Sequence, residues 1–74
     1  MARYIVTRQN ADGTFDQVGM NSRMLISDYK TYRNAYKYAI NPFGNGKLCR
    51  VEVYCSSVYT APLQTFTVTT TPAA

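Results

Sequence analysis

The sequence predicts a small α+β domain in which one helix packs on one face of a four-stranded, mainly antiparallel sheet, in the order ββαββ. Three observations predict this class. Residues 27–40 are the only segment with clear helical periodicity. The segments on either side are short, rich in β-branched and aromatic residues, and separated by turn residues. A chain of 74 residues holds one modest core, so we expect a single domain, residues 1–74, with a frayed tail at 71–74.

Two strands are expected before the helix. Residues 2–9 are rich in strand-forming side chains, and Asp12-Gly13 in the turn that follows supplies the positive φ that a hairpin needs. Residues 14–18 then form a short second strand. Residues 19–26 leave two interpretations open: they extend the second strand past a bulge at Gly19, or they cross the sheet edge to reach the helix.

The helix is expected over residues 27–40. Ser27 is an N-cap residue type, and Asn41-Pro42 predicts the end, because proline disfavours helical geometry at the preceding residue. The Gly44-Asn45-Gly46 turn follows at once. One arc of the helix is mostly aromatic and should pack on the sheet: Tyr29, Tyr32, Ala35, Tyr36, Ala39 and Ile40.

Two strands follow the helix, over residues 47–56 and 63–70, joined by a loop at 57–62. Alternation places Cys49, Val51, Val53 and Cys55 on the face toward the helix, and Leu48, Arg50, Glu52 and Tyr54 on the opposite, open face. The two cysteines lie roughly 20 Å apart along such a strand, which is too far for a disulfide. We expect both to be free, buried thiols, as in a cytosolic protein.

The charge balance indicates anionic partners. The net charge is +4 at pH 7 and the sequence pI is about 9.3, which suits nucleic acid, an acidic protein or a membrane surface. However, no apolar run approaches the ~20 residues that a membrane span needs, and the chain does not open with a signal-peptide pattern. We therefore expect a cytoplasmic protein without a membrane partner.

Residue types that carry catalysis or bind metals are scarce. Histidine is absent, and the spacing of the four carboxylates brings no two of them together: Asp12, Asp16, Asp28 and Glu52. Two cysteines are too few for a structural zinc site. The stretch Gly44-Asn45-Gly46-Lys47 leads into a strand, whereas a phosphate-binding loop opens a helix. We expect no enzymatic activity, no cofactor and no metal.

Binding is the function that remains, and two surfaces are candidates. Lys30, Arg33 and Lys37 have the helical spacing i, i+3, i+7, with Asn34 and Tyr38 beside them for hydrogen bonding and stacking. A plain solvated helix face is the alternative interpretation of this pattern. The second surface is the open sheet face with Arg50 and Tyr54, which could stack bases or dock on another protein.

The layout and composition of the chain, above all from Ser27, Ala35 and Ala39 through Cys49-Arg50-Val51-Glu52-Val53, resemble small phage-encoded inhibitor proteins, including anti-CRISPR proteins. The resemblance implies a non-enzymatic inhibitor in the host cytoplasm. Such a protein would dock its basic helix face on a nucleic-acid-handling defence complex and block that complex's nucleic-acid binding. Two alternatives stay open. One is direct, sequence-independent binding of DNA or RNA, and the other is a structural or assembly protein that oligomerises through its open sheet face. The chain would be a monomer or a homodimer.

Overall fold

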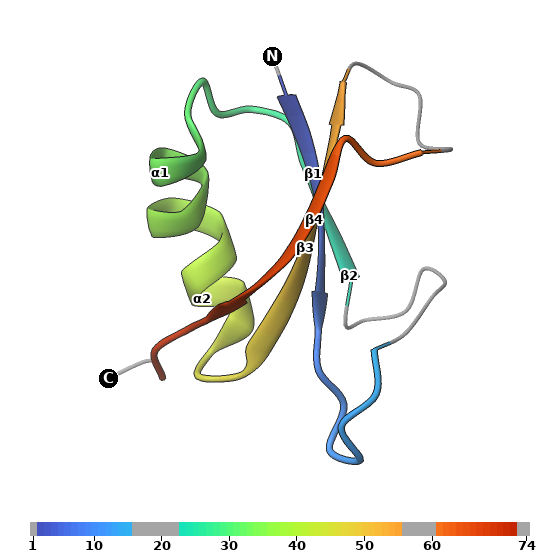
Figure 1. Cartoon of the computed structure of the whole chain (residues 1–74). Helices are drawn as coiled ribbons and strands as arrows, with labels where there is room; N and C mark the ends of the chain where they lie inside the picture. Colours follow the sequence, from blue (N-terminus) through green and yellow to red (C-terminus); the bar gives the residue numbers. More distant parts are fainter. Residues whose placement is uncertain (1, 16–22, 56–60, 73–74) are drawn as a thin grey trace.

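The computed structural model describes residues 2–15, 23–55 and 61–72 (Figure 1). Four antiparallel strands form one sheet in the order β2-β1-β3-β4, and one helical segment covers one of its faces. The strands are β1 (Ala2–Arg8), β2 (Arg23–Ile26), β3 (Leu48–Cys55) and β4 (Gln64–Thr69). The α+β class and the ββαββ order are confirmed.

The core lies between the helical segment and the two central strands. In β1 and β3, Val6 lies opposite Val51, and both side chains are fully buried. Alternate residues of the strands face the helix, as the period of two requires. The buried core consists of Tyr4, Val6, Ile26, Ala35, Ile40, Cys49 and Val51.

The structure corrects the position of the second strand. Phe15 forms an isolated antiparallel bridge with Gln9, and residues 16–18, like the proposed bulge at Gly19, lie outside the described residues. The second strand of the sheet is β2, which pairs with β1 from Tyr4 to Thr7. Its position has a physical cause, because Ile26 is buried in the core and Met24 packs against it. The predicted turn is confirmed at Gly13, whose φ is +91°.

The helical segment begins and ends later than the sequence predicts. Thr31, not Ser27, is the N-cap, and its Oγ1 accepts the backbone N–H of Asn34 at 3.2 Å. The segment runs through α1 (Tyr32–Ala35), a π-helical stretch η1 (Tyr36–Ile40) and α2 (Asn41–Gly44). Pro42 does not end it: the helical backbone continues from η1 into α2, with Ile40 and Asn41 both in the right-handed helical conformation. The Asn41 N–H donates to the Tyr36 carbonyl five residues back, so Pro42 follows a π-helical turn and not a regular α-helical one. Asn45, in the left-handed conformation at φ 48°, ends the segment.

The aromatic arc packs on the sheet as predicted. Ala35 and Ile40 are buried, while Tyr29, Tyr32, Tyr36 and Ala39 are partly buried against the core. Tyr32 meets two rings of the sheet edge-to-face, with its centroid 5.7 Å from that of Tyr4 and 5.4 Å from that of Phe66. The predicted aromatic residues therefore pack on the sheet, although Tyr29 lies before the first residue of the helical segment.

The two cysteines are free, but they differ in burial. Cys49 is buried as predicted, whereas Cys55 is exposed, so the expectation of two buried thiols is wrong for Cys55. Burial along this face of β3 falls from Cys49 and Val51, through the half-buried Val53, to Cys55 at the last position of the strand.

Candidate functional site

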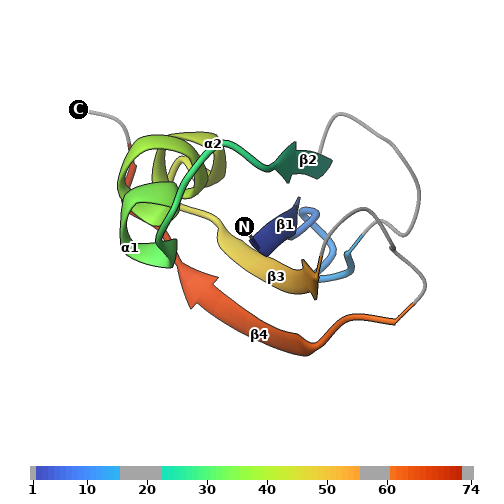
Figure 2. The same ribbon diagram turned by 90° about the horizontal axis from the view of Figure 1, so that it is seen from above.

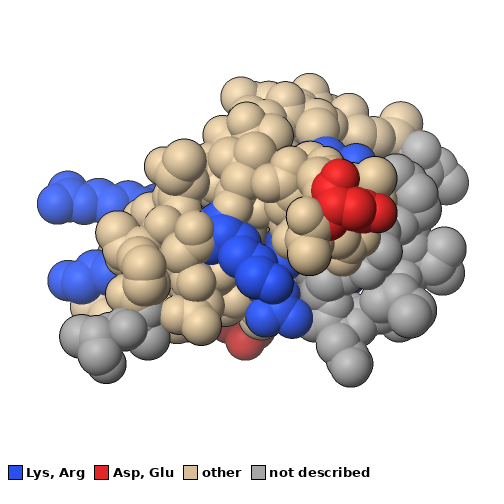
Figure 3. Space-filling view, turned by 90° about the horizontal axis from the view of Figure 1, so that it is seen from below, with Lys and Arg blue, Asp and Glu red and all other residues tan. Residues whose placement is uncertain are grey.

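The exposed residues Lys30, Arg33, Asn34, Lys37 and Tyr38 are called here the basic helix face. All five are exposed in the structure. Arg33 and Lys37 lie four residues apart, which is about one helical turn. Lys30 precedes the N-cap Thr31, so the predicted helical spacing does not apply to it. In Figure 3, Lys and Arg side chains project from the side of the molecule that carries the helical segment.

Tyr38 is the aromatic member of this surface. Its side chain is 59% exposed. The ring lies almost parallel to that of Tyr29, with an interplanar angle of 11° and centroids 6.5 Å apart. The Nζ atom of Lys37 lies 5.2 Å from the centroid of the Tyr38 ring. Because Tyr29 packs against the core, this stack holds an exposed ring in a defined position beside the Lys37 ammonium.

The cations of the basic helix face are not neutralised by carboxylates in the described residues. The two ion pairs found there both belong to Glu52, on the open sheet face. Lys30, Arg33 and Lys37 therefore turn their charges toward solvent. Such uncompensated positive charge attracts an anionic surface and raises the rate at which it is encountered.

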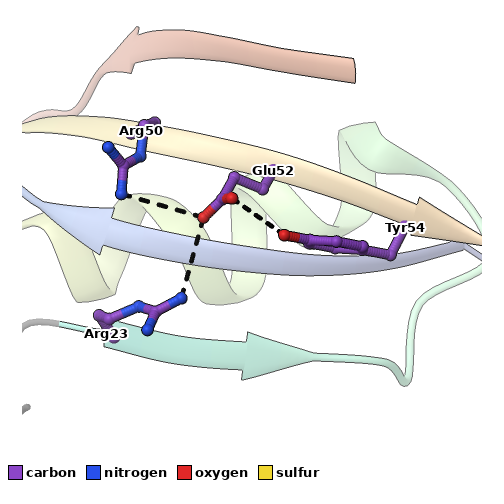
Figure 4. A network of polar contacts seen from close by, with 4 residues as sticks. All are labelled: Arg23, Arg50, Glu52 and Tyr54. Carbon is purple, nitrogen blue, oxygen red and sulfur yellow. Dashed lines mark hydrogen bonds and ion pairs between the residues drawn. The ribbon is translucent and has the colours of Figure 1, made fainter. Parts of the chain in front are cut away.

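The open sheet face, by contrast, carries an internal polar network (Figure 4). The Tyr54 hydroxyl donates to Glu52 Oε2 at 2.9 Å. Glu52 Oε1 lies 3.9 Å from Arg23 Nη2 and 4.0 Å from Arg50 Nη2. The Arg50 guanidinium also lies over the Phe15 ring, 5.3 Å from its centroid. Arg50 is thus engaged by two neighbours within its own domain.

The expectation of an exposed Tyr54 ring is wrong, because Tyr54 is only 4% exposed. Burial, and secondly the hydrogen bond to Glu52, raise the pKa of Tyr54 above its ordinary value. The neutral phenol is therefore favoured in the folded protein, as a donor to the carboxylate requires. A buried ring of this kind cannot stack on bases. Arg50 and Tyr54 belong to the Glu52 network and are not part of the basic helix face.

Sequence reasoning missed two features of these surfaces. The first is Arg23, because its approach to Glu52 depends on the pairing of β2 with β1. The alternation along β3 does predict that Arg50, Glu52 and Tyr54 lie on one face and can contact one another. The second is the Tyr29–Tyr38 stack, for which the sequence carries no signal beyond the two tyrosines.

In the described ranges, no cluster of three or more His, Cys, Asp or Glu residues could hold a metal ion. Within the same residues, no helix has the length and apolar character needed to cross a membrane. No protein-family model, curated protein or solved structure matches the chain.

Proposed function

We propose that this chain is a non-enzymatic binding protein that docks its basic helix face on an acidic surface of a partner protein. The observation that carries the proposal is the exposed group Arg33, Lys37 and Tyr38, whose two cations form no ion pair within the described residues. Arginine and tyrosine are among the residue types that dominate binding energy at protein interfaces. A ring held in place by Tyr29 also loses little side-chain entropy when it is buried by a partner.

The partner class that we propose is a nucleic-acid-handling defence complex in the cytoplasm of a host cell. The chain would inhibit it, in the manner of an anti-CRISPR protein, by blocking its access to nucleic acid. The support is the resemblance in architecture and composition described above. A small domain that binds beside the nucleic-acid-binding site of such a complex, through charge complementarity, blocks that site sterically.

Direct binding of nucleic acid is the second candidate. It is favoured by the combination of two cations one turn apart with an exposed aromatic ring, which suits phosphates and bases respectively. Against it, the Tyr38 ring already faces Tyr29 and lies close to the Lys37 ammonium. These contacts reduce the ring area that a base could stack on, so we place the protein partner first.

Charge reversal tests the proposal. The wild-type chain is immobilised, incubated with host lysate, and its partner identified by mass spectrometry and then purified. The triple variant Lys30→Glu, Arg33→Glu, Lys37→Glu should fold but lose the purified partner, because exposed substitutions usually change stability by only about 0.5 kcal/mol each. Wild-type affinity in the triple variant would refute the assignment of this surface.

A matched pair of single variants separates location from net charge. Arg33→Glu and Lys47→Glu change the net charge equally, and both side chains are exposed. Only Arg33→Glu should weaken binding substantially. Titration with generic DNA and RNA at several salt concentrations distinguishes the second candidate, since phosphate neutralisation gives a steep salt dependence.

A further inference from the structure

The outer edge of β4 lies at one margin of the sheet, and in Figure 2 no described element lies beyond it. Edge strands of natural proteins are usually protected by charge, proline or shortness. The six residues of β4, Gln64–Thr69, include neither a charged residue nor a proline. The opposite edge strand, β2, has four residues and carries Arg23. The two edges are therefore protected unequally.

The backbone groups that β4 presents at this edge follow from the register. The Gln9 N–H donates to the Leu48 carbonyl at 2.9 Å, so the backbone groups of Leu48 point toward the β1 side. Leu48 lies opposite Thr69, so the groups of Thr69 point away from β3, and alternation gives Thr65 and Thr67 the same direction. The Tyr36 hydroxyl, which donates to the Thr69 carbonyl at 2.9 Å, agrees with this direction.

We propose that a second copy of this chain pairs antiparallel with β4 about a two-fold axis at Thr67. The two four-stranded sheets would then form one continuous sheet. In this register Thr67 faces Thr67 of the second copy, Thr65 faces Thr69, and Phe66 faces Val68. One face of the junction contains threonine pairs and the other contains aromatic–β-branched pairs, both of which are favourable across strands. Hydrogen bonds would join the outward backbone groups of Thr65, Thr67 and Thr69 in each copy. The Thr69 carbonyl would use its second lone pair, because it already accepts the Tyr36 hydroxyl.

The strand itself favours a second copy over other occupants. Its sequence is self-complementary in this register and places no like charges opposite each other. Pairing of β4 with β2 of another copy would produce an open-ended array instead of a closed dimer, and the short, arginine-bearing β2 offers little edge for it. Each copy carries a net charge of +4, so salt should strengthen the dimer by screening. Binding of an anionic partner should weaken under the same conditions, which makes the two proposals independently testable.

Sedimentation and light scattering over a concentration series test the dimer. We expect a mass twice the 8.3 kDa of one chain, falling toward 8.3 kDa on dilution. Thr67→Lys should give the monomer at concentrations where the wild type is dimeric, because it sets two ammonium groups opposite each other at the axis. Ala11→Lys, in the exposed turn after β1, adds the same charge and should leave the dimer intact. Circular dichroism verifies that each variant is folded.

A second variant and a direct contact measurement complete the test. Thr65→Pro removes an outward-facing N–H, which an edge strand tolerates within its own sheet, and it should also yield the monomer. In a sample that mixes isotope-labelled and unlabelled chains, a nuclear Overhauser effect should connect the Phe66 and Val68 Hα protons of different copies. A mass of one chain at every concentration would overturn the proposal. So would a dimer that survives both variants, or one that Leu25→Lys on the open sheet face abolishes instead.

Discussion

The side-chain amide of Asn41 binds the backbone N–H and the side-chain hydroxyl of Thr71. Its Oδ1 accepts the Thr71 backbone N–H at 2.8 Å, and its Nδ2 donates to Thr71 Oγ1 at 2.9 Å. Asn41 lies in the first turn of α2, whereas Thr71 follows β4. These two bonds therefore fix the last strand of the sheet to the end of the helical segment.

Replacement of Asn41 by alanine should destabilise the fold by about 1 kcal/mol. The two short hydrogen bonds to Thr71 are lost, each contributing roughly 0.5–1.5 kcal/mol, and the better helix propensity of alanine offsets about 0.5 kcal/mol of that. Urea unfolding gives the change in free energy. Asn34→Ala is the matched control, since Asn34 is exposed on the same helical segment and should be neutral or slightly stabilising. Equal effects of the two substitutions would contradict the role given to Asn41.

Gly44 and Thr70 form a close contact that a larger residue would break. Gly44 is buried, and a Cβ atom added there would overlap the Thr70 side chain. Thr70 cannot easily move away, because it is 8% exposed and its hydroxyl donates to the Lys47 carbonyl at 2.6 Å. The glycine is therefore needed for space, at the end of a helical segment.

Gly44→Ala should destabilise the protein by about 1–3 kcal/mol, the range typical of overpacking. Thermal and urea unfolding measure the loss. A double-mutant cycle with Thr70→Ala identifies the cause. Removal of the Thr70 Cγ2 and Oγ1 atoms makes room for the new methyl group, so the double variant should lose less stability than the sum of the single variants. Strict additivity would show that the two side chains do not compete for space.

The sequence predicts three of the four strands better than the ends of the helix. β1, β3 and β4 are found within one residue of each expected boundary, because alternation of residue types marks a two-sided strand clearly. The helix start is ambiguous, since Ser27 and Thr31 are both N-cap residue types. Its end is missed because Pro42 follows a π-helical turn, and the helical backbone continues past it to Gly44.

The two candidate surfaces also differ in how well the sequence predicts them. The exposure of Arg33, Lys37 and Tyr38 could be predicted because they fall off the aromatic arc of one local element. The network at Glu52 depends on neighbours from another strand. Thr7 of β1 lies opposite Arg23 of β2 and also opposite Arg50 of β3, a juxtaposition that only the strand order reveals.

Alkaline pH should destabilise the protein through Tyr54. Its pKa is raised in the fold, so the unfolded chain ionises first, at a pH of about 10. Stability from this group is complete below that pH and is lost as pH rises toward the folded-state pKa. Tyr54→Phe should reduce the decline in unfolding free energy between about pH 9 and 11, measured by urea unfolding. An unchanged slope in Tyr54→Phe would count against this linkage.

The two thiols should differ in reactivity. Cys55 is exposed, whereas Cys49 is fully buried, and burial raises the pKa of its thiol despite the opposing effect of the Arg8 guanidinium. Since the thiolate is the nucleophile, both shielding and protonation should slow the alkylation of Cys49. Mass spectrometry should find one modified cysteine per folded chain, at position 55, and two after denaturation. The Cys55→Ser variant should show no rapid modification while folded, and rapid labelling of Cys49 in that variant would refute the packing of β3 beneath the helical segment.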